Sequence, residues 1–175
     1  VYTIAIALRE SGKLLGRPVR VFGSDISRRC VGAARRGVYG ASAFRATPPE
    51  IRSRYFEPRA DGDHVAAELR EVCQFGHLNL IDADRAALVG RNDVIFCRNV
   101  LIYLDPAARR RVIEVFYERL RPGGFLLLGH SESLLNVSTA FELCHLRDDL
   151  VYRKPLTAER IGAALPPRSS RRARG

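Results

Sequence analysis

The 175-residue chain has no methionine and no tryptophan, and no apolar run approaches the ~20 residues that cross a bilayer. The start lacks the basic segment and cleavage site of a secretory signal. Its four cysteines are scattered without a CxxC pair, which leaves zinc and redox motifs unsupported. We therefore predict no metal, no membrane insertion and a cytoplasmic setting. Because position 1 is valine and opens within an apolar periodic run, we interpret the chain as an N-terminally truncated piece.

Positive charge is in excess, with a formal net charge of +10. Such an excess suggests an anionic partner, which could be nucleic acid, a membrane surface or an acidic protein. Part of it lies in the segment 156–175, a basic tail or linker that we predict to be disordered. The clusters 35–36 and 109–111 are interpreted as solvated helix faces. No aromatic–basic interleaving of the kind used in stacking platforms occurs, so nucleic acid is not expected.

The first half of the chain predicts a helix, a strand and a second helix. Apolar residues recur with helical spacing over 1–10, and 19–23 is a short β-rich run. Ser27 is a candidate N-cap for a helix that Gly37 would end. A strand, a loop and a helix in this order form the basic piece of a parallel sheet.

The second half repeats that alternation and closes with a hairpin. The run 94–97 is apolar throughout, as expected for a strand covered on both faces, and Asp105-Pro106 opens a helix. Another apolar strand is predicted over 125–128, and the runs 141–143 and 150–152 predict an antiparallel hairpin. The sequence therefore predicts an α/β sheet with an antiparallel edge, whose ligands bind at the carboxyl ends of its strands.

Two polar residues in the first half are candidates for binding a nucleoside. Asp25 follows a predicted strand, where a carboxylate accepts hydrogen bonds from ribose hydroxyls, although it could equally cap the next helix. Asn79 precedes a loop, where its amide could bind an adenine edge with Leu80 against the base. For Asn79 alone, a turn residue is the simpler interpretation.

The stretch 96–103 is the most informative. Arg98 and Asn99 follow directly on an apolar strand, and Tyr103 comes five residues after Arg98. A buried arginine needs a partner, which predicts either an anionic ligand or an internal acid with the tyrosine packed in the core. His130 and Glu132 could form an acid/base pair or hold their loop, and the lack of a nucleophile favours the loop.

Seven short motifs, taken together, resemble the CheR-type chemotaxis receptor methyltransferases, which are protein-glutamate O-methyltransferases. The resemblance covers about 1–154. In chain order, the motifs are Ser24-Asp25-Ile26, Arg36-Gly37-Val38-Tyr39, Tyr55-Phe56, Leu78-Asn79-Leu80, Phe96-Cys97-Arg98-Asn99-Val100-Leu101-Ile102-Tyr103, Leu120-Arg121-Pro122-Gly123-Gly124 and Gly129-His130-Ser131-Glu132.

The resemblance implies a Rossmann-like methyltransferase sheet that binds S-adenosyl-L-methionine and releases S-adenosyl-L-homocysteine. Asp25 matches the ribose-binding carboxylate of the family, and Asn79 with Leu80 matches its contacts to adenine. Arg98 and Asn99 match the pair beside the cofactor, and Tyr103 matches a tyrosine near the transferred methyl group. We expect Arg98 and Tyr103 to be the catalytic residues.

Three departures from the family pattern qualify these expectations. The glycine-rich cofactor loop with its first strand and the small N-terminal helical domain would both precede Val1. The small β-subdomain, expected over about 57–77 within a catalytic domain of 1–155, is shorter than in members that grip a receptor tether, which suggests independence from one. We expect this piece alone to bind cofactor poorly and to turn over little.

The expected reaction is methyl transfer to glutamate side chains of methyl-accepting chemotaxis receptors, which gives glutamyl methyl esters in sensory adaptation. The expected partner is the cytoplasmic helical region of the receptor, and the expected state is a monomer. The alternative is a non-catalytic regulatory or binding module that keeps the methyltransferase fold.

Overall fold

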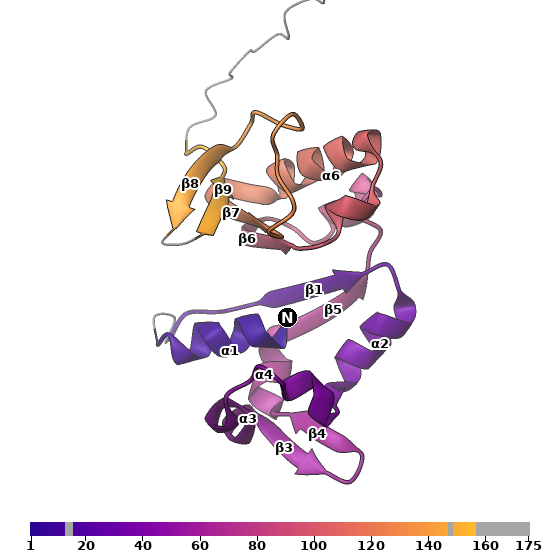
Figure 1. The fold of residues 1–175 in the computed structure, drawn as a ribbon, viewed down its shortest axis with the longest axis vertical. Coiled ribbons are helices and arrows are strands. Elements are labelled where there is room, and N and C mark those ends of the chain that lie inside the picture. Colours follow the sequence, from indigo (N-terminus) through magenta and orange to yellow (C-terminus); the bar gives the residue numbers. More distant parts are fainter. Residues whose placement is uncertain (13–15, 147–148, 157–175) are drawn as a thin grey trace, which may run out of the picture. The chain divides into compact units, whose positions relative to one another are not determined.

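The computed structural model describes residues 1–12, 16–146 and 149–156 (Figure 1). The chain divides into two compact units, Val1–Val89 and Gly90–Gly175, and each is described by itself. The predicted disordered tail lies outside the described residues from position 157 onward, as do Arg147 and Asp148. Among the described residues, none of the helices combines the length and apolarity that a bilayer crossing requires.

A parallel strand pair organises the first unit. Strand β1 pairs with β5 from Val21↔Cys73 to Asp25↔His77, so both strands end at the same edge. The elements around this pair are α1 (Tyr2–Glu10), β1 (Val21–Asp25), α2 (Arg28–Arg36), α4 (Ala67–Val72), β5 (Cys73–His77) and α5 (Ala83–Ala87). The strand predicted over 19–23 is therefore placed two residues further along, and it includes Asp25.

Local capping explains where α2 begins and ends. The Ser27 hydroxyl accepts a hydrogen bond from the Cys30 backbone N–H, which satisfies one of the unpaired donors of the first turn. Gly37 ends the helix in the left-handed region, with φ of 65°. Both residues act as the sequence predicts.

The core of the first unit lies between α1, α4 and the parallel pair. Leu69 is fully buried, and the Tyr2 ring packs against Phe75 at 5.2 Å between centroids. The buried core residues are Tyr2, Ala5, Ile6, Val21, Tyr55, Val65, Leu69 and Cys73. Apolar area removed from water stabilises by about 25 cal/mol per Å², so this cluster anchors both strands.

A small antiparallel sheet, in the order β2-β4-β3, forms the rest of the unit. Its elements are β2 (Val38–Tyr39), the 3₁₀ turn Ala41–Phe44, α3 (Pro49–Tyr55), β3 (Phe56–Arg59) and β4 (Gly62–Val65). The Arg52 guanidinium binds the buried Asp63 carboxylate through two nitrogens, Nε at 3.0 Å and Nη2 at 2.5 Å. The sheet differs from the expected insertion over 57–77, because it recruits 38–39 while 73–77 pairs with β1.

A four-stranded mixed sheet, in the order β6-β7-β9-β8, forms the second unit. The pair β6 and β7 is parallel, and β9 pairs antiparallel with both β7 and β8, which confirms the predicted hairpin. The elements are β6 (Asn92–Cys97), the 3₁₀ turn η2 (Leu101–Tyr103), α6 (Pro106–Arg119), β7 (Leu120–Leu128), β8 (Glu142–Leu146) and β9 (Asp149–Arg153). The α/β class with an antiparallel edge is thus confirmed.

Two details of the second unit depart from expectation. Strand β7 begins at Leu120, so the strand predicted over 125–128 starts five residues earlier and includes 121–124. Val94 and Phe96 of β6 keep 43% and 47% exposure, so the expected burial on both faces is wrong in the described residues. Because successive side chains of a strand point to opposite faces, Val94 and Phe96 lie on the same face of the sheet.

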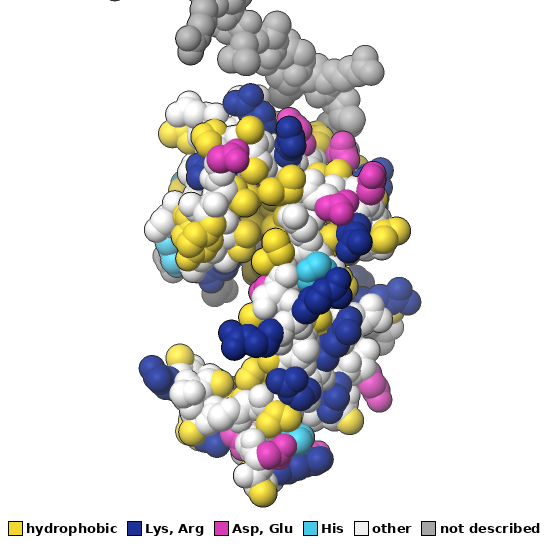
Figure 2. All heavy atoms as spheres, turned by 90° about the vertical axis from the view of Figure 1, so that its right-hand side faces the viewer, with side chains coloured by type: hydrophobic (Ala, Val, Ile, Leu, Met, Phe, Trp, Pro, Cys, Tyr) yellow, Lys and Arg dark blue, Asp and Glu magenta, His cyan; other side chains and the backbone are white. Residues whose placement is uncertain are grey.

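Basic side chains are unevenly distributed over the first unit. Figure 2 shows Lys and Arg gathered on the face of this unit that carries α2. Four of the nine residues of that helix are arginine.

Candidate functional site

The carboxyl ends of β1 and β5 bring Asp25 next to the loop that carries Asn79. The Leu78 backbone N–H donates to the Asp25 carbonyl at 3.1 Å, which ties the loop to the end of β1. Asp25 Oδ1 accepts the Ser27 backbone N–H at 2.7 Å. Oδ2 has no hydrogen-bond partner among the described residues, and the side chain is exposed. Asp25 therefore forms a turn that leads into α2 and still offers an acceptor to a ligand hydroxyl.

Asn79 has a structural role that the sequence also predicts. Its Oδ1 accepts the Ile81 N–H at 3.1 Å, and its carbonyl accepts the Asp82 N–H at 3.0 Å. These bonds make Asn79 a turn residue. Its amide Nδ2 carries no bond within the described part of the chain, and Leu80 is half-buried beside it. Contact of both residues with adenine stays a prediction.

The second unit holds Arg98, Asn99 and Tyr103 on the loop after β6. Asn99 has φ of 58°, a left-handed conformation that asparagine adopts more readily than most residues. The chain then enters η2, whose Leu101 side chain is buried while Tyr103 is 82% exposed. Arg98 is exposed and makes no ion pair with a described residue, so the expectation of a buried arginine with an internal acid is wrong.

Glu132 holds this loop through its carboxylate. Oε2 accepts the backbone N–H groups of Asn99 and Gly129, each at 2.8 Å. Oε1 accepts those of Val100 at 2.9 Å and Leu101 at 2.8 Å. Four donors on one carboxylate leave it unsuited to proton transfer, and the loop-holding interpretation of Glu132 is confirmed. His130, its predicted alternative partner, is exposed.

The ionised form of Glu132 is favoured by these bonds. Partial burial raises the pKa of a carboxyl group, but the four backbone N–H donors together outweigh it and hold the pKa of Glu132 below its ordinary value. The carboxylate is therefore a permanent anion at neutral pH. Because its bonds reach across 31 to 33 residues to the loop, it joins the ends of β6 and β7.

Gly129 and Arg109 support the same loop, a role that the sequence alone did not predict for either residue. A Cβ at Gly129 would lie 2.5 Å from Asn99 Oδ1 and 2.8 Å from Glu132 Oε2, so only glycine fits. Arg109 is half-buried and donates to the carbonyls of Leu101 at 3.2 Å and Leu104 at 3.4 Å. Its predicted place on a solvated helix face is thus wrong. Arg109 lies four residues after the Asp105 cap, and this position in the sequence does not predict that its side chain binds the loop.

The cysteine beside the loop is unreactive. Cys97 is buried at the end of β6, and desolvation together with the negative charge of Glu132 raises its pKa to about 12. A thiol with that pKa stays protonated at neutral pH, which excludes it as a nucleophile. Within the described ranges, no three His, Cys, Asp or Glu side chains converge as a metal site would require.

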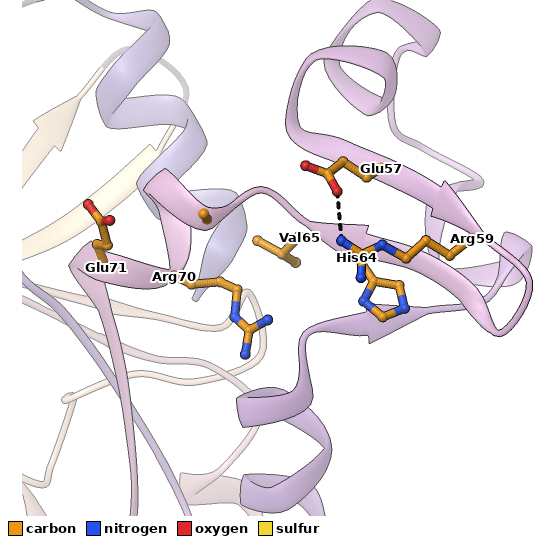
Figure 3. Close-up of a pocket in the computed structure, with 7 residues that line it drawn as sticks. Glu57, Arg59, His64, Val65, Arg70 and Glu71 are labelled. Carbon is orange, nitrogen blue, oxygen red and sulfur yellow. Dashed lines mark hydrogen bonds and ion pairs between the residues drawn. The ribbon is translucent and has the colours of Figure 1, made fainter.

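A cavity of about 240 Å³ opens between β3, β4 and α4 (Figure 3). It is lined by Glu57, Arg59, His64, Val65, Ala67, Arg70 and Glu71. Its charges are largely balanced, with Arg59 and Glu57 paired at 2.9 Å. None of the predicted site residues lines it.

The predicted site residues fall into two groups. Asp25, Asn79 and Leu80 lie in the first unit, where two strands end together. Arg98, Asn99 and Tyr103 lie in the second, on the loop that Glu132 holds. Asp25 keeps one oxygen free at the carboxyl end of a parallel strand, and its contact with a ribose diol stays a prediction. The fold and these residues define an α/β domain of the class that binds nucleoside cofactors.

The comparisons with known proteins identify the family. The family described as CheR methyltransferase, SAM binding domain matches residues 1–149. "Chemotaxis protein methyltransferase 2" of Vibrio cholerae is 37% identical over 156 residues, which are 88% of this chain and 54% of that protein. The protein of the same name from Pseudomonas aeruginosa is 37% identical over 141 residues, 78% of this chain and 50% of that protein. The chain belongs to the CheR methyltransferase family, and the cofactor of this domain is S-adenosylmethionine, as predicted.

The chain spans about half the length of these curated relatives. Among solved structures, magnesium protoporphyrin IX methyltransferase of Synechocystis with bound SAM matches 86% of this chain and 74% of its own, with a TM-score of 0.43 and 16% identity.

Proposed function

We propose that the full-length protein transfers the methyl group of S-adenosylmethionine to glutamate side chains of chemotaxis receptors, which gives glutamyl methyl esters. The observation that carries this proposal is the family match over 1–149 together with curated relatives named chemotaxis protein methyltransferase. The partner is the cytoplasmic helical region of a receptor, and the protein acts in the cytoplasm. Residues 1–155 supply the catalytic domain and 156–175 a basic tail or linker.

Asp25, Asn79 and Leu80 are proposed to hold the nucleoside part of the cofactor. The free oxygen of Asp25 accepts from ribose hydroxyls, and Asp25 stays oriented because its other oxygen is bonded to the Ser27 N–H. The amide of Asn79 faces the adenine edge, with Leu80 against the ring. The cofactor supplies a methyl group that its sulfonium already activates, so the protein needs no strong acid or base.

Arg98 and Tyr103 are proposed to orient the acceptor carboxylate. Glutamate has an ordinary pKa of ~4.3 and is an anion at neutral pH. A guanidinium and a phenol can bind the two carboxylate oxygens and align one of them for attack on the methyl group of the cofactor. These contacts also replace part of the hydration shell of the carboxylate. Asn99 lies next to the cofactor. Glu132 holds the backbone of the loop that carries Arg98, Asn99 and Tyr103 in one conformation. The entropy cost of ordering this loop for the reaction is therefore small.

The test uses the full-length protein, S-adenosylmethionine labelled in its methyl group, and a receptor cytoplasmic fragment. We expect label on the fragment, release of that label as methanol in alkali, and loss of labelling when the acceptor glutamates are replaced by alanine. Alkali-stable label, or none, would contradict the proposal. Binding of S-adenosylhomocysteine without labelling would favour the alternative of a non-catalytic module.

A further inference from the structure

The α2 region concentrates positive charge without any acidic residue. Between positions 26 and 49 the sequence has five arginines and no aspartate or glutamate. Four of these arginines lie on α2, and all four are exposed. They are Arg28, Arg29, Arg35 and Arg36.

The helical period places the four arginines on one face of α2. At ~100° per residue they fall within an arc of about 120°, as two columns, Arg28 with Arg35 and Arg29 with Arg36. The members of a column are two turns apart, which is about 10.5 Å along the axis. Gly32 lies between the columns, and a Cβ there would lie 3.8 Å from Arg36 Nη1, so the Arg36 guanidinium reaches the position where Gly32 has no side chain. The buried residue Val31 lies outside this arc, about 40° beyond Arg35 around the helix.

The fold does not neutralise this face. Elsewhere the described arginines commonly pair with carboxylates, as Arg52 does with Asp63 and Arg153 with Glu142. No described carboxylate pairs with any arginine of α2. Arg35 alone has a polar contact within the described residues, to the Phe75 carbonyl at 3.1 Å and 2.6 Å. Arg70 adds a further cation by donating to the Arg35 carbonyl at 3.4 Å.

Two of these arginines also oppose the dipole of their own helix. Arg28 and Arg29 lie in the first turn, where unpaired backbone N–H groups carry partial positive charge and where α2 has no acidic residue. Cations at this end destabilise a helix, whereas anions stabilise it. The charges of Arg28 and Arg29 therefore do not stabilise α2, whereas those of Arg35 and Arg36 in the last turn favour the helix dipole.

We propose that the arginine face of α2, defined as Arg28, Arg29, Arg35 and Arg36, is a docking surface for an acidic α-helical surface on a protein. Carboxylates two turns apart on a helix repeat at the same ~10.5 Å as each arginine column. Guanidinium groups bind carboxylates through two nitrogens, so each arginine of a column can pair with one carboxylate of such a helix. Resting on the proposed function, the partner is the glutamate-bearing helical region of the receptor.

A protein partner suits this face better than nucleic acid does. Between the arginines, Cys30 and Ala33 are exposed and small, Gly32 is half-buried, and α2 has no aromatic side chain for base stacking. The face is therefore a charged strip for side-by-side helix contact, and its main effects are on association rate and orientation.

The test compares two double charge reversals in the full-length protein. Arg29→Glu with Arg36→Glu removes one column, and neither side chain has a hydrogen bond or ion pair among the described residues. The first change favours the helix dipole and the second opposes it, so fold stability changes little. The matched control is Arg110→Glu with Arg111→Glu on α6, which alters net charge equally at exposed positions of the other unit.

We expect the α2 variant to weaken binding of a receptor cytoplasmic fragment about tenfold at 50 mM salt, with the difference shrinking at 500 mM as screening increases. The control should bind within about twofold of wild type. S-adenosylhomocysteine affinity and kcat should stay unchanged, so KM alone rises. Equal loss in both variants would overturn the proposal, as would a loss independent of salt.

Two further binding assays distinguish a receptor partner from nucleic acid and from a membrane surface. A 20-base-pair DNA duplex and vesicles containing phosphatidylserine replace the fragment in the same binding assay. Tighter binding of either than of the fragment, lost in the α2 variant, would overturn the proposal in favour of that partner. Fragment binding needs no turnover, so a fragment that binds through α2 without becoming methylated refutes the proposed reaction and leaves the docking surface standing.

Discussion

Replacing Glu132 with glutamine tests whether one carboxylate organises the Arg98–Tyr103 loop. Glutamine keeps the shape and one acceptor oxygen, which can still accept two of the four N–H groups now bound at 2.8 Å to 2.9 Å. Its NH₂ group then faces the other two donors. Each buried donor left without an acceptor costs ~1–3 kcal/mol, and because the site is only partly buried we expect a total loss of about 2–4 kcal/mol.

The measurement is urea denaturation at pH 7, followed by circular dichroism. The matched control is Glu142→Gln in the same unit, where the Glu142 carboxylate pairs with Arg153 at 2.7 Å on the surface. Exposed pairs contribute ~0–1 kcal/mol, so this control should change the free energy of unfolding by less than 1 kcal/mol. If both variants lose the same amount, the four bonds to Glu132 do not hold the loop and the reasoning fails.

The remaining predictions concern acid, sterics and the proposed site. Since the folded state lowers the pKa of Glu132, its stabilisation is present above the ordinary value of 4.5 and is lost as pH falls through the folded-state pKa; wild type should lose more stability below pH 4.5 than Glu132→Gln does. Gly129→Ala places a Cβ 2.5 Å from Asn99 Oδ1 and should cost ~1–3 kcal/mol in urea denaturation, while Gly40→Ala, with open space around it, should cost less. Asp25→Asn keeps an acceptor for the Ser27 N–H but loses the charge offered to ribose, and calorimetry should show S-adenosylhomocysteine binding about tenfold weaker; unchanged affinity would remove Asp25 from the cofactor site. Tyr103→Phe should lower kcat at least ~10-fold at constant cofactor affinity, and because Tyr103 is 82% exposed the fold should be unaffected; unchanged turnover would show that the hydroxyl has no catalytic role.

Local signals in the sequence predicted the ends of several elements. The caps at Ser27 and Asp105 act on N–H groups three residues ahead, at 3.3 Å and 2.8 Å, so the interaction is encoded within one turn. Gly37 ends α2 for an equally local reason, since its φ of 65° suits glycine. The terminal hairpin follows from two β-rich runs, 141–143 and 150–152, that lie close together in the sequence. These features depend on neighbours in sequence, which is why the residues alone predict them.

The family motifs likewise indicated the fold class and the cofactor before any coordinates. The family match over 1–149 and the α/β architecture agree with both. The roles of Asp25, Asn79, Leu80, Arg98, Asn99 and Tyr103 remain proposals that the experiments above test.

The amino-acid sequence by itself thus determined the alternation of strands and helices outside the small antiparallel sheet, several helix caps and the family of the chain. Only the tertiary structure decided that Cys73–His77 joins β1 rather than the small antiparallel sheet, and that Arg98 is exposed. It also decided that Glu132 binds four N–H groups, three of them more than 30 residues away. Such contacts depend on which distant segments pack together, and that choice follows from burial of the whole core rather than from any local pattern.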